Sequence, residues 1–195
     1  MNDWNETYSV IIVEDDLDFV WLIQSMIEDT AGLRFAGYAS DIAGAGRLAA
    51  ETRADIALVD LGLGSQDLGG IEAAKAIRLN SRAKVLLLTS YEDPEIIISA
   101  SKRSFASGYI FKSQYGQLTD IIRKTARGNT PQQVMIKELI LKDLTNAERS
   151  VFSTLMGENV AVHSAEKTIA NQKTSIFKKL GLKNAQELCR IFHNY

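Results

Sequence analysis

Five polar side chains stand directly after short apolar runs, at points where the strands of a sheet would end. They are Glu14 and Asp15 after Val10–Val13, Asp60 after Ile56–Val59, Thr89 after Val85–Leu88, and Lys112 after Gly108–Phe111. Each run has the length and composition of a buried parallel strand. Because the carboxyl ends of such strands line one crevice, we expect the five groups to meet there.

The chemistry of these groups indicates a site for a divalent cation and a phosphoryl group. Three carboxylates held together repel one another, so Glu14, Asp15 and Asp60 form a stable cluster only if a hard cation shares them. Ligands that are all oxygen favour Mg²⁺. A metal against Asp60 would orient a phosphoryl group for attack by this carboxylate, with Lys112 and Thr89 binding phosphoryl oxygens. Any one of these residues could be an ordinary polar side chain at a strand end, but their joint placement favours a site.

The residues at these strand ends resemble the receiver domain of two-component response regulators. The resemblance implies that Asp60 is the phosphoacceptor, and that Glu14, Asp15, Asp60 and the backbone carbonyl of Gly62 hold the metal. Residues 62–70, which follow the phosphoacceptor position, contain no proline and are somewhat longer than usual in the family. This difference predicts a mobile or reshaped loop beside the metal.

The resemblance also implies roles for the residues on the last two strands. Lys112 and Thr89 would be catalytic, and Thr89 and Tyr109 would be switch residues that move toward the phosphoryl group. The chain would not be an enzyme in the ordinary sense, although it could catalyse its own phosphorylation and dephosphorylation. Its expected partner is a cognate sensor histidine kinase or a phosphotransfer protein.

Alternating strand-like and amphipathic segments predict an α/β fold with a doubly wound, five-stranded parallel sheet. By resemblance it is flavodoxin-like, with strand order 2-1-3-4-5, and a small all-α domain follows it. The predicted strands are 9–14, 35–40, 56–61, 84–89 and 108–112. The predicted helices are 17–29, 42–52, 71–80, 94–103 and 117–127.

Charge is distributed unevenly along the chain. Residues 1–122 contain 10 Lys and Arg against 18 Asp and Glu, whereas residues 123–195 contain 12 against 6. An acidic first part suits a magnesium site, and a basic second part suits a phosphate backbone. Ordinary variation in a solvated surface would also give this pattern.

Composition excludes several other classes of protein. The single cysteine, Cys189, excludes an internal disulfide framework, and two histidines with one cysteine leave too few ligands for a zinc site. Met1–Thr7 is polar and acidic, and no later apolar run has the length needed to cross a bilayer. We expect a soluble cytoplasmic protein that does not bind membranes.

The last part of the chain has the signals of a small helical domain. Thr145 and Glu148 form a Thr-x-x-Glu capping box, and Gly157 would end the helix that this box begins. A second helix would begin after the N-cap Ser164, and Asn184 would cap a third. Together with Leu144, the segment 164–181 resembles the LuxR-type helix-turn-helix domain, in which a Lys-Thr pair opens the recognition helix and Lys-Leu-Gly ends it.

At 3.6 residues per turn, this recognition helix would have an apolar face and an opposite polar face. The resemblance implies that the polar face enters the major groove of double-stranded DNA, with phosphate and base contacts from Lys167, Thr168, Asn171, Thr174 and Lys178. A solvated helix face without a ligand would have the same pattern.

Two departures from the LuxR-type pattern lie beside this helix. Only nine residues separate Gly157 from Lys167, about five fewer than a complete scaffold helix needs. Lys173 lies in the middle of the apolar arc, where burial of an unpaired ammonium would be costly. The shortened segment and Lys173 predict either a modified DNA-binding domain or one that has another role.

We therefore assign residues 1–128 to a receiver domain, 129–143 to a connector and 144–195 to an output domain. The first function class is a phosphorylation-controlled transcription regulator that dimerises and binds DNA. The second is a response regulator whose tail serves protein–protein interaction or dimerisation. A metal-dependent phosphatase built on the same sheet is disfavoured, because no separate acid–base residue accompanies the cluster.

Overall fold

The structure, a computed structural model, describes residues 6–64, 68–160, 165–193 and 195. The chain divides into two compact units, Met1–Ile136 and Lys137–Tyr195, called the N-terminal and C-terminal units below. The division lies within the segment that we assigned to the connector. No helix in the described ranges combines the length and apolar character needed to span a membrane.

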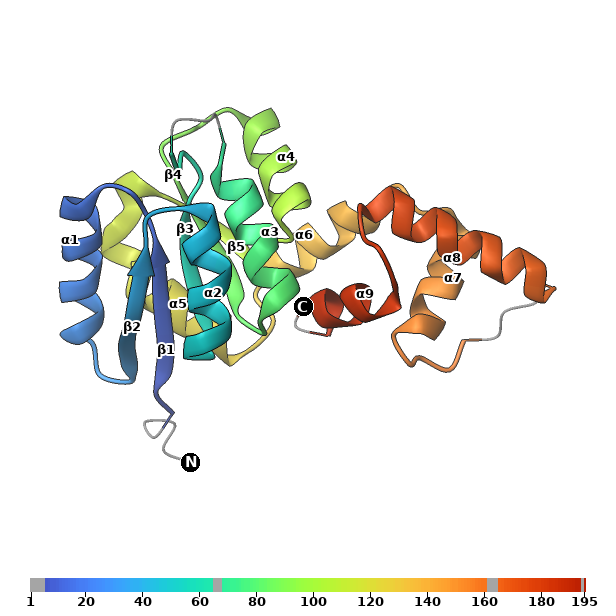
Figure 1. Ribbon diagram of the computed structural model, residues 1–195, viewed down its shortest axis with the longest axis horizontal. Coiled ribbons are helices and arrows are strands. Elements are labelled where there is room, and N and C mark those ends of the chain that lie inside the picture. Colours follow the sequence, from blue (N-terminus) through green and yellow to red (C-terminus); the bar gives the residue numbers. More distant parts are fainter. Residues whose placement is uncertain (1–5, 65–67, 161–164, 194) are drawn as a thin grey trace. The chain divides into compact units, whose positions relative to one another are not determined.

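The N-terminal unit is built on a five-stranded parallel sheet (Figure 1). Its spatial order is β2 (Leu33–Ala39), β1 (Tyr8–Val13), β3 (Ile56–Asp60), β4 (Lys84–Thr89) and β5 (Gly108–Phe111). This order confirms the predicted 2-1-3-4-5 topology and the α/β class. The strand order places the carboxyl ends of β1 and β3 side by side at the centre of the sheet.

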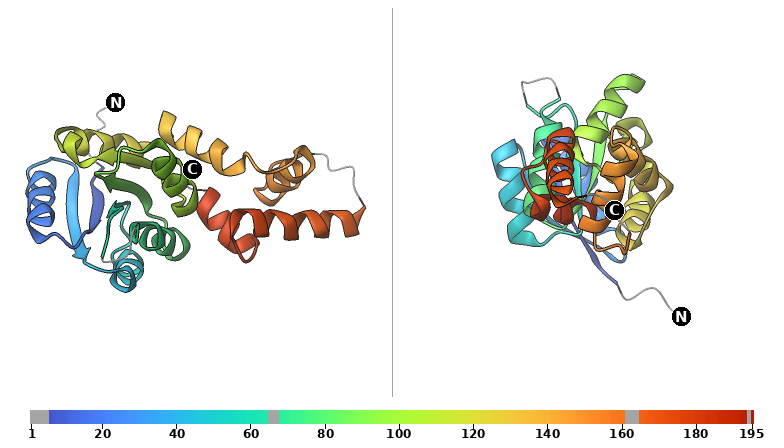
Figure 2. Two further views of the ribbon diagram at one scale, coloured as in Figure 1. Left: turned by 90° about the horizontal axis from the view of Figure 1, so that it is seen from above. Right: turned by 90° about the vertical axis from the view of Figure 1, so that its right-hand side faces the viewer.

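Helices cover both faces of the sheet, as Figures 1 and 2 show. One face packs under α1 (Leu17–Glu28) and α5 (Leu118–Arg127), and the other under α2 (Ile42–Thr52), α3 (Gly70–Asn80) and α4 (Pro94–Ser104). Alternate strand residues point to opposite faces, so Ile12 belongs to the first core and Ile11 to the second. Both cores are apolar, which explains why the strands read as continuous apolar runs.

Capping groups fix where several of these helices begin. The Asp16 carboxylate accepts hydrogen bonds from two backbone N–H groups in the first turn of α1. The Asp93 carboxylate accepts one such bond, from the backbone N–H of Glu95, at the start of α4, whose first position is Pro94, where the missing N–H costs no hydrogen bond. A 3₁₀ helix, η1 (Lys112–Gln117), follows β5 directly and was not predicted.

The connector helix α6 (Pro131–Leu141) crosses the division between the two units. The C-terminal unit then contains α7 (Asn146–Leu155), α8 (Glu166–Leu180) and α9 (Ala185–Phe192), and α8 is the longest of the three (Figure 2). The rings of Phe152 and Phe192 meet edge to face at 5.0 Å in its core. The predicted small all-α region is thereby confirmed.

Local sequence determines most ends of these helices. The capping box of Thr145 and Glu148 is complete, and Asn184 caps α9 through the backbone N–H of Glu187. Gly157 has φ +85° just beyond α7, a conformation that favours glycine. The N-cap position of α8 is Ala165, which makes no side-chain cap bond, and the predicted cap Ser164 lies outside the described residues.

Candidate acidic site and helical output unit

An acidic cluster lies at the carboxyl ends of β1 and β3. The two strands pair with Val13 opposite Val59, so the next residues, Glu14 and Asp60, are neighbours. One carboxylate oxygen from each of Glu14, Asp15 and Asp60 lies within 4.8 Å of the others. Glu14 and Asp60 are buried and Asp15 is exposed, so the cluster opens to solvent on one side.

Lys112 reaches this cluster from the end of β5. Its Nζ lies 2.6 Å from Oε2 of Glu14 and 3.2 Å from Oδ1 of Asp60. The same ammonium lies 4.6 Å from the centre of the Phe19 ring on α1, where the negative face of the ring attracts a cation. Lys112 therefore holds the two buried carboxylates together from one side.

Mutual charge and burial shift the pKa values of this pair. Burial raises the pKa of the Glu14 carboxyl, the hydrogen bond from Lys112 lowers it, and the charge of Asp60 raises it, with a net upward shift. Burial lowers the pKa of Lys112, but the hydrogen bond to Glu14 and the charge of Asp60 outweigh this effect and raise it overall. Lys112 therefore remains charged at neutral pH and balances part of the negative charge.

The loop between β3 and α3 closes over the cluster through its backbone. A Cβ atom on Gly62 would lie 3.4 Å from Oδ2 of Asp60, so the chain passes directly beside this carboxylate. The backbone N–H of Gly64 donates a hydrogen bond to Oδ2 of Asp15 at 3.2 Å. A Cβ on Gly70 would lie 2.0 Å from the Asp60 carbonyl oxygen, so a side chain at this position would force the backbone to shift. Residues 65–67 of the predicted reshaped loop lie outside the described residues.

Thr89 lies at the strand ends beside Asp60. Asp60 pairs with Leu88 across β3 and β4, which places Thr89 one residue farther along β4. The Thr89 side chain is buried, and its hydroxyl oxygen accepts a hydrogen bond from the backbone N–H of Tyr91 at 2.9 Å. The hydroxyl is thereby held by the loop that leads into α4.

Tyr109 lies farther back along β5, opposite Leu87. Its half-buried ring packs against the core under α2, α3 and α4, and it meets the Phe111 ring edge to face at 5.4 Å. The predicted switch pair thus lies on adjacent strands, with Thr89 at the strand ends and Tyr109 two residues before the end of β5.

The donor atoms fit a hard divalent cation. All three side chains of the cluster offer carboxylate oxygens, which Mg²⁺ prefers, and they carry more negative charge than Lys112 balances. The backbone at Gly62 lies directly beside the Asp60 carboxylate. The group of residues that we predicted as metal ligands is therefore chemically suited to Mg²⁺.

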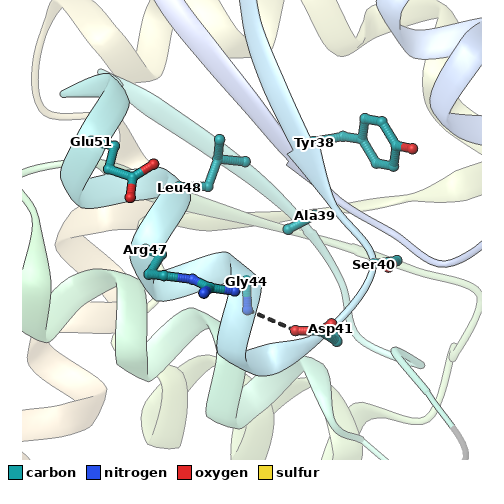
Figure 3. A pocket seen from close by; sticks show the side chains of 8 residues that line it. All are labelled: Tyr38, Ala39, Ser40, Asp41, Gly44, Arg47, Leu48 and Glu51. Carbon is teal, nitrogen blue, oxygen red and sulfur yellow. Dashed lines mark hydrogen bonds between the residues drawn. The ribbon is translucent and has the colours of Figure 1, made fainter.

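A pocket of about 560 Å³ lies elsewhere on this unit, between the end of β2 and α2 (Figure 3). Its lining includes Tyr38, Asp41, Arg47 and Glu51 but none of the three clustered carboxylates. The Asp41 carboxylate already accepts a hydrogen bond from the backbone N–H of Gly44 at 2.6 Å, as the cap of α2. This carboxylate therefore serves the local fold, and the pocket is separate from the acidic cluster.

In the C-terminal unit, Glu148 joins α7 to α8. Its buried carboxylate accepts hydrogen bonds from the Ser175 hydroxyl and the Lys179 ammonium, each at 2.6 Å, and from the backbone N–H of Thr145 at 2.8 Å. Burial raises the pKa of Glu148, but the bonds from Lys179, Ser175 and Thr145 outweigh it and lower the pKa to about 2. Glu148 is therefore an ionised link between the two helices.

The five predicted DNA contacts all lie on α8 and are exposed: Lys167, Thr168, Asn171, Thr174 and Lys178. On the other side of the helix, Ile176 and Leu180 are buried. The Thr174 hydroxyl donates to the carbonyl of Ala170 within the helix. The predicted polar and apolar faces are therefore present.

The segment between α7 and α8 has no helix among its described residues, 156–160 and 165. Lys173 is exposed, although it lies on the arc between Ile169 and Ile176. An exposed ammonium carries no burial penalty, which explains how this residue is tolerated. The exposure of Lys173 also means that this part of α8 is less covered than a complete helix-turn-helix would require.

The sequence patterns did not identify several residues of these sites. Phe19 gave no signal beyond an apolar position in α1, and Glu148 was identified as part of a capping box and of the LuxR-type resemblance but not as a link to α8. Ser175 and Lys179 are four residues apart and share one helix face, which could have suggested a common partner. The close approach of Gly70 to Asp60 could not be inferred without the path of the loop.

Comparisons with known proteins agree with this geometry. Residues 10–123 match the family described as the response regulator receiver domain. The transcriptional regulatory protein YdfI of Bacillus subtilis is 27% identical, over 93% of each chain. A LuxR-family two-component response regulator from Aurantimonas is 28% identical with a TM-score of 0.59, over 71% of this chain and 98% of that one.

A further solved structure shares the fold of almost the whole chain. It is RcsB from Salmonella enterica serovar Typhimurium bound to promoter rprA in the presence of a beryllofluoride phosphomimetic. It is 20% identical with a TM-score of 0.56, over 96% of this chain and 99% of that one. Since the receiver family matches more than half of the sequence, the chain belongs to the response regulator family, with an N-terminal receiver domain followed by a helical C-terminal unit.

Proposed function

We propose that this response regulator accepts a phosphoryl group on Asp60 and regulates transcription through DNA binding by its C-terminal domain. The observation that carries the proposal is the contact of Lys112 with both Glu14 and Asp60 inside a three-carboxylate cluster. We further propose the division into a receiver at 1–128, a connector at 129–143 and an output domain at 144–195.

Asp60 is the nucleophile in this proposal. A carboxylate oxygen of Asp60 forms a bond to phosphorus while the bond from phosphorus to the nitrogen of a donor phosphohistidine breaks. The leaving imidazole takes up a proton, and Asp60 becomes an acyl phosphate. The donor belongs to a sensor histidine kinase or a phosphotransfer protein, and a small phosphoryl donor replaces it when the receiver catalyses its own phosphorylation.

Glu14, Asp15, Asp60 and the Gly62 carbonyl would hold Mg²⁺. When bound, this ion supplies charge neutralisation and orientation of the phosphoryl oxygens. Lys112 shifts from its contact with Asp60 to a phosphoryl oxygen and remains an ammonium through the reaction. The Phe19 ring, 4.6 Å from the ammonium, keeps Lys112 at the edge of the site.

Thr89 and Tyr109 carry the response away from Asp60. The Thr89 hydroxyl leaves the Tyr91 N–H, to which it is bonded at 2.9 Å, and donates to the new phosphoryl group. Tyr109 then turns inward beside it. This rearrangement promotes a homodimer and frees the C-terminal domain for its target.

The polar face of α8 supports the DNA-binding part of the proposal. Lys167 and Lys178 are exposed cations at the two ends of this face, and Asn171 between them can pair with a base edge. YdfI and LiaR of Bacillus subtilis, each 27% identical, are named transcriptional regulatory proteins. RcsB, which shares the fold, was solved bound to a promoter.

A second function is favoured by one observation, the absence of a helix from the described residues between α7 and α8. A recognition helix without its scaffold would be seated poorly on DNA. In this alternative the exposed arc at Lys173 serves as a protein-interaction or dimerisation surface.

The test of the phosphoacceptor is mass spectrometry of full-length protein incubated with phosphoramidate and Mg²⁺. We expect one added phosphoryl group, removed by hydroxylamine as an acyl phosphate must be, and none in Asp60→Asn. Asp29→Asn is the matched control, because Asp29 is an exposed carboxylate at the end of α1. Undiminished labelling of Asp60→Asn would overturn the assignment.

A further inference from the structure

Gln132, the second residue of α6, holds the outer edge of β5. Its side-chain oxygen accepts a hydrogen bond from the Tyr109 backbone N–H at 3.3 Å, and its side-chain nitrogen donates to the Tyr109 carbonyl at 3.4 Å. β5 is the last strand of the sheet, so these two backbone groups have no neighbouring strand on that side. The Gln132 amide therefore pairs with Tyr109 as one residue of an added strand would.

Gly108 makes room for this contact. A Cβ atom at position 108 would lie 2.5 Å from the Gln132 side-chain oxygen and 3.0 Å from a methyl group of Leu86. Real Cβ atoms do not approach a neighbour to 2.5 Å, so a side chain here would displace Gln132. Because Gly108 has no side chain, the Gln132 amide has the space that it needs to reach Tyr109.

The first turn of α6 is defined independently of Gln132. The Thr130 hydroxyl accepts from the backbone N–H of Gln133, and the Gln133 side-chain oxygen accepts from the backbone N–H of Thr130, at 3.2 and 2.8 Å. This capping box, with Pro131 at the first helical position, fixes where α6 begins. Gln132 makes neither of these bonds, so its contact with Tyr109 adds a further restraint on a turn that other residues begin.

The chain just before α6 is tied to the neighbouring strand. Nζ of Lys84 on β4 donates to the carbonyl of Thr125 at 2.8 Å and to that of Gly128 at 3.4 Å. The end of α5 is thereby fixed to the body of the sheet. The bonds of Lys84 thus hold the segment before α6, whereas the bonds of Gln132 join the first turn of α6 to Tyr109.

From this geometry we infer that Gln132 is a latch that couples Tyr109 to the connector helix. The inference rests on the proposed function, in which modification of Asp60 turns Tyr109 inward. When Tyr109 turns, the backbone N–H and carbonyl to which the Gln132 amide bonds change their positions. Its two hydrogen bonds are long and exposed, so they break before the backbone pairing of β4 with β5 does. The modified receiver then releases the first turn of α6.

The test is amide hydrogen exchange by NMR on the full-length protein, with and without beryllofluoride and Mg²⁺. The direct reporter is the Tyr109 amide, and Val134, whose N–H bonds to the Thr130 carbonyl, reports on α6. We expect the mimic to speed exchange of both amides about fivefold, which corresponds to the loss of one net hydrogen bond. In Gln132→Ala, both amides should exchange at the faster rate already and no longer respond, while Leu61 and Thr89 still do.

Two further variants test whether the effect depends on the position of the Gln132 side chain. Met135→Ala changes an exposed side chain on the same helix and should respond as the natural sequence does. Gly108→Ala retains Gln132 but displaces it, and it should reproduce the Gln132→Ala pattern. A full response of the Tyr109 and Val134 amides in Gln132→Ala would overturn the latch. So would a natural protein in which Leu61 and Thr89 respond to the mimic and these two amides do not.

The outcomes also separate the latch from the function on which it rests. If no amide near Asp60 responds to the mimic in any variant, the proposed phosphoacceptor site is wrong, and the latch fails with it. If the Tyr109 amide responds to the mimic but the Val134 amide does not, the latch fails. The receiver chemistry then stands, and the connector is controlled by another contact.

Discussion

The acidic site and the exposed polar face of α8 are assembled in different ways. Glu14 and Asp60 are neighbours because two parallel strands pair in one register, and Lys112 is brought to them by the strand order of the whole sheet. In the C-terminal unit, α8 is joined to α7 by apolar packing and by one buried carboxylate, Glu148. Backbone topology therefore makes the first site robust to sequence change, whereas the second depends on a few side chains.

The largest effect should come from a change that breaks the acidic site through its backbone. In Gly70→Ala, the new Cβ would meet the Asp60 carbonyl oxygen at 2.0 Å and the Leu61 Cα at 2.7 Å, and neither atom can move alone. We expect the N-terminal unit to lose more than about 3 kcal/mol of stability. Denaturation followed by tryptophan fluorescence measures this, since Trp21 lies on α1 in this unit and the sequence of residues 137–195 contains no tryptophan.

Gly116→Ala is the control for this substitution, because a Cβ there has no heavy atom within 4 Å. It should leave the fluorescence transition unchanged. A Gly70→Ala variant as stable as Gly116→Ala would contradict the described path of the loop.

A slightly smaller effect is expected for acid titration of the C-terminal unit. The pKa of Glu148 is about 2 when folded, below its ordinary value of 4.5, so the unfolded chain takes up the proton first. The resulting stabilisation, at most about 3 kcal/mol, is present above pH 4.5 and is lost as the pH falls toward 2. Exchange of α7 and α8 amides between pH 6 and pH 3, corrected for intrinsic rates, reports this loss.

Glu148→Gln should remove most of this stabilisation at neutral pH and flatten the acid dependence. Glu158→Gln serves as the control, since Glu158 is exposed. An unchanged acid profile in Glu148→Gln would mean that the link to Lys179 and Ser175 does not stabilise the unit.

A moderate effect is expected when Lys112 is replaced by methionine. Loss of the ammonium 2.6 Å from Glu14 and 3.2 Å from Asp60 leaves the carboxylates without their nearby cation. Mg²⁺ should then bind about tenfold more tightly, while labelling by phosphoramidate falls. Calorimetric Mg²⁺ titration measures the affinity, with the exposed Lys124→Met as control. Weaker Mg²⁺ binding in Lys112→Met would show that the ammonium does not compete for these oxygens.

The smallest effect is expected at Lys173. Because this side chain is exposed, Lys173→Ala should change the stability of the C-terminal unit by less than about 0.5 kcal/mol. Lys179→Ala, which removes a bond to Glu148, should destabilise the same unit measurably more. Equal losses in the two variants, measured by amide exchange in α8, would place Lys173 in a packed environment.

These two regions also differ in how far their sequences predicted them. The strand ends at Glu14, Asp60 and Thr89 could be read directly, because each polar residue interrupts an apolar run. The caps at Thr145 and Asn184 were predictable for the same reason, since a cap is a local pattern. The Thr130–Gln133 box follows the same rule and was overlooked.

Contacts between distant segments could not be predicted in this way. Phe19 beside Lys112, Gln132 on Tyr109 and Glu148 beneath Lys179 each join residues far apart in the sequence. Nothing in the local pattern of one partner specifies the other. The burial of Lys173 was judged from helix periodicity alone, and its exposure depends on what covers α8.

We propose that the acidic site of the receiver controls DNA binding by the C-terminal domain. The most direct test of this proposal is fluorescence anisotropy of the full-length protein with a pool of its own genomic DNA fragments, with and without beryllofluoride and Mg²⁺. We expect enrichment of a defined fragment, strengthened by the mimic and weakened as salt rises. No enrichment in either state, from protein shown to bind the mimic, would contradict it and assign the C-terminal domain to another partner.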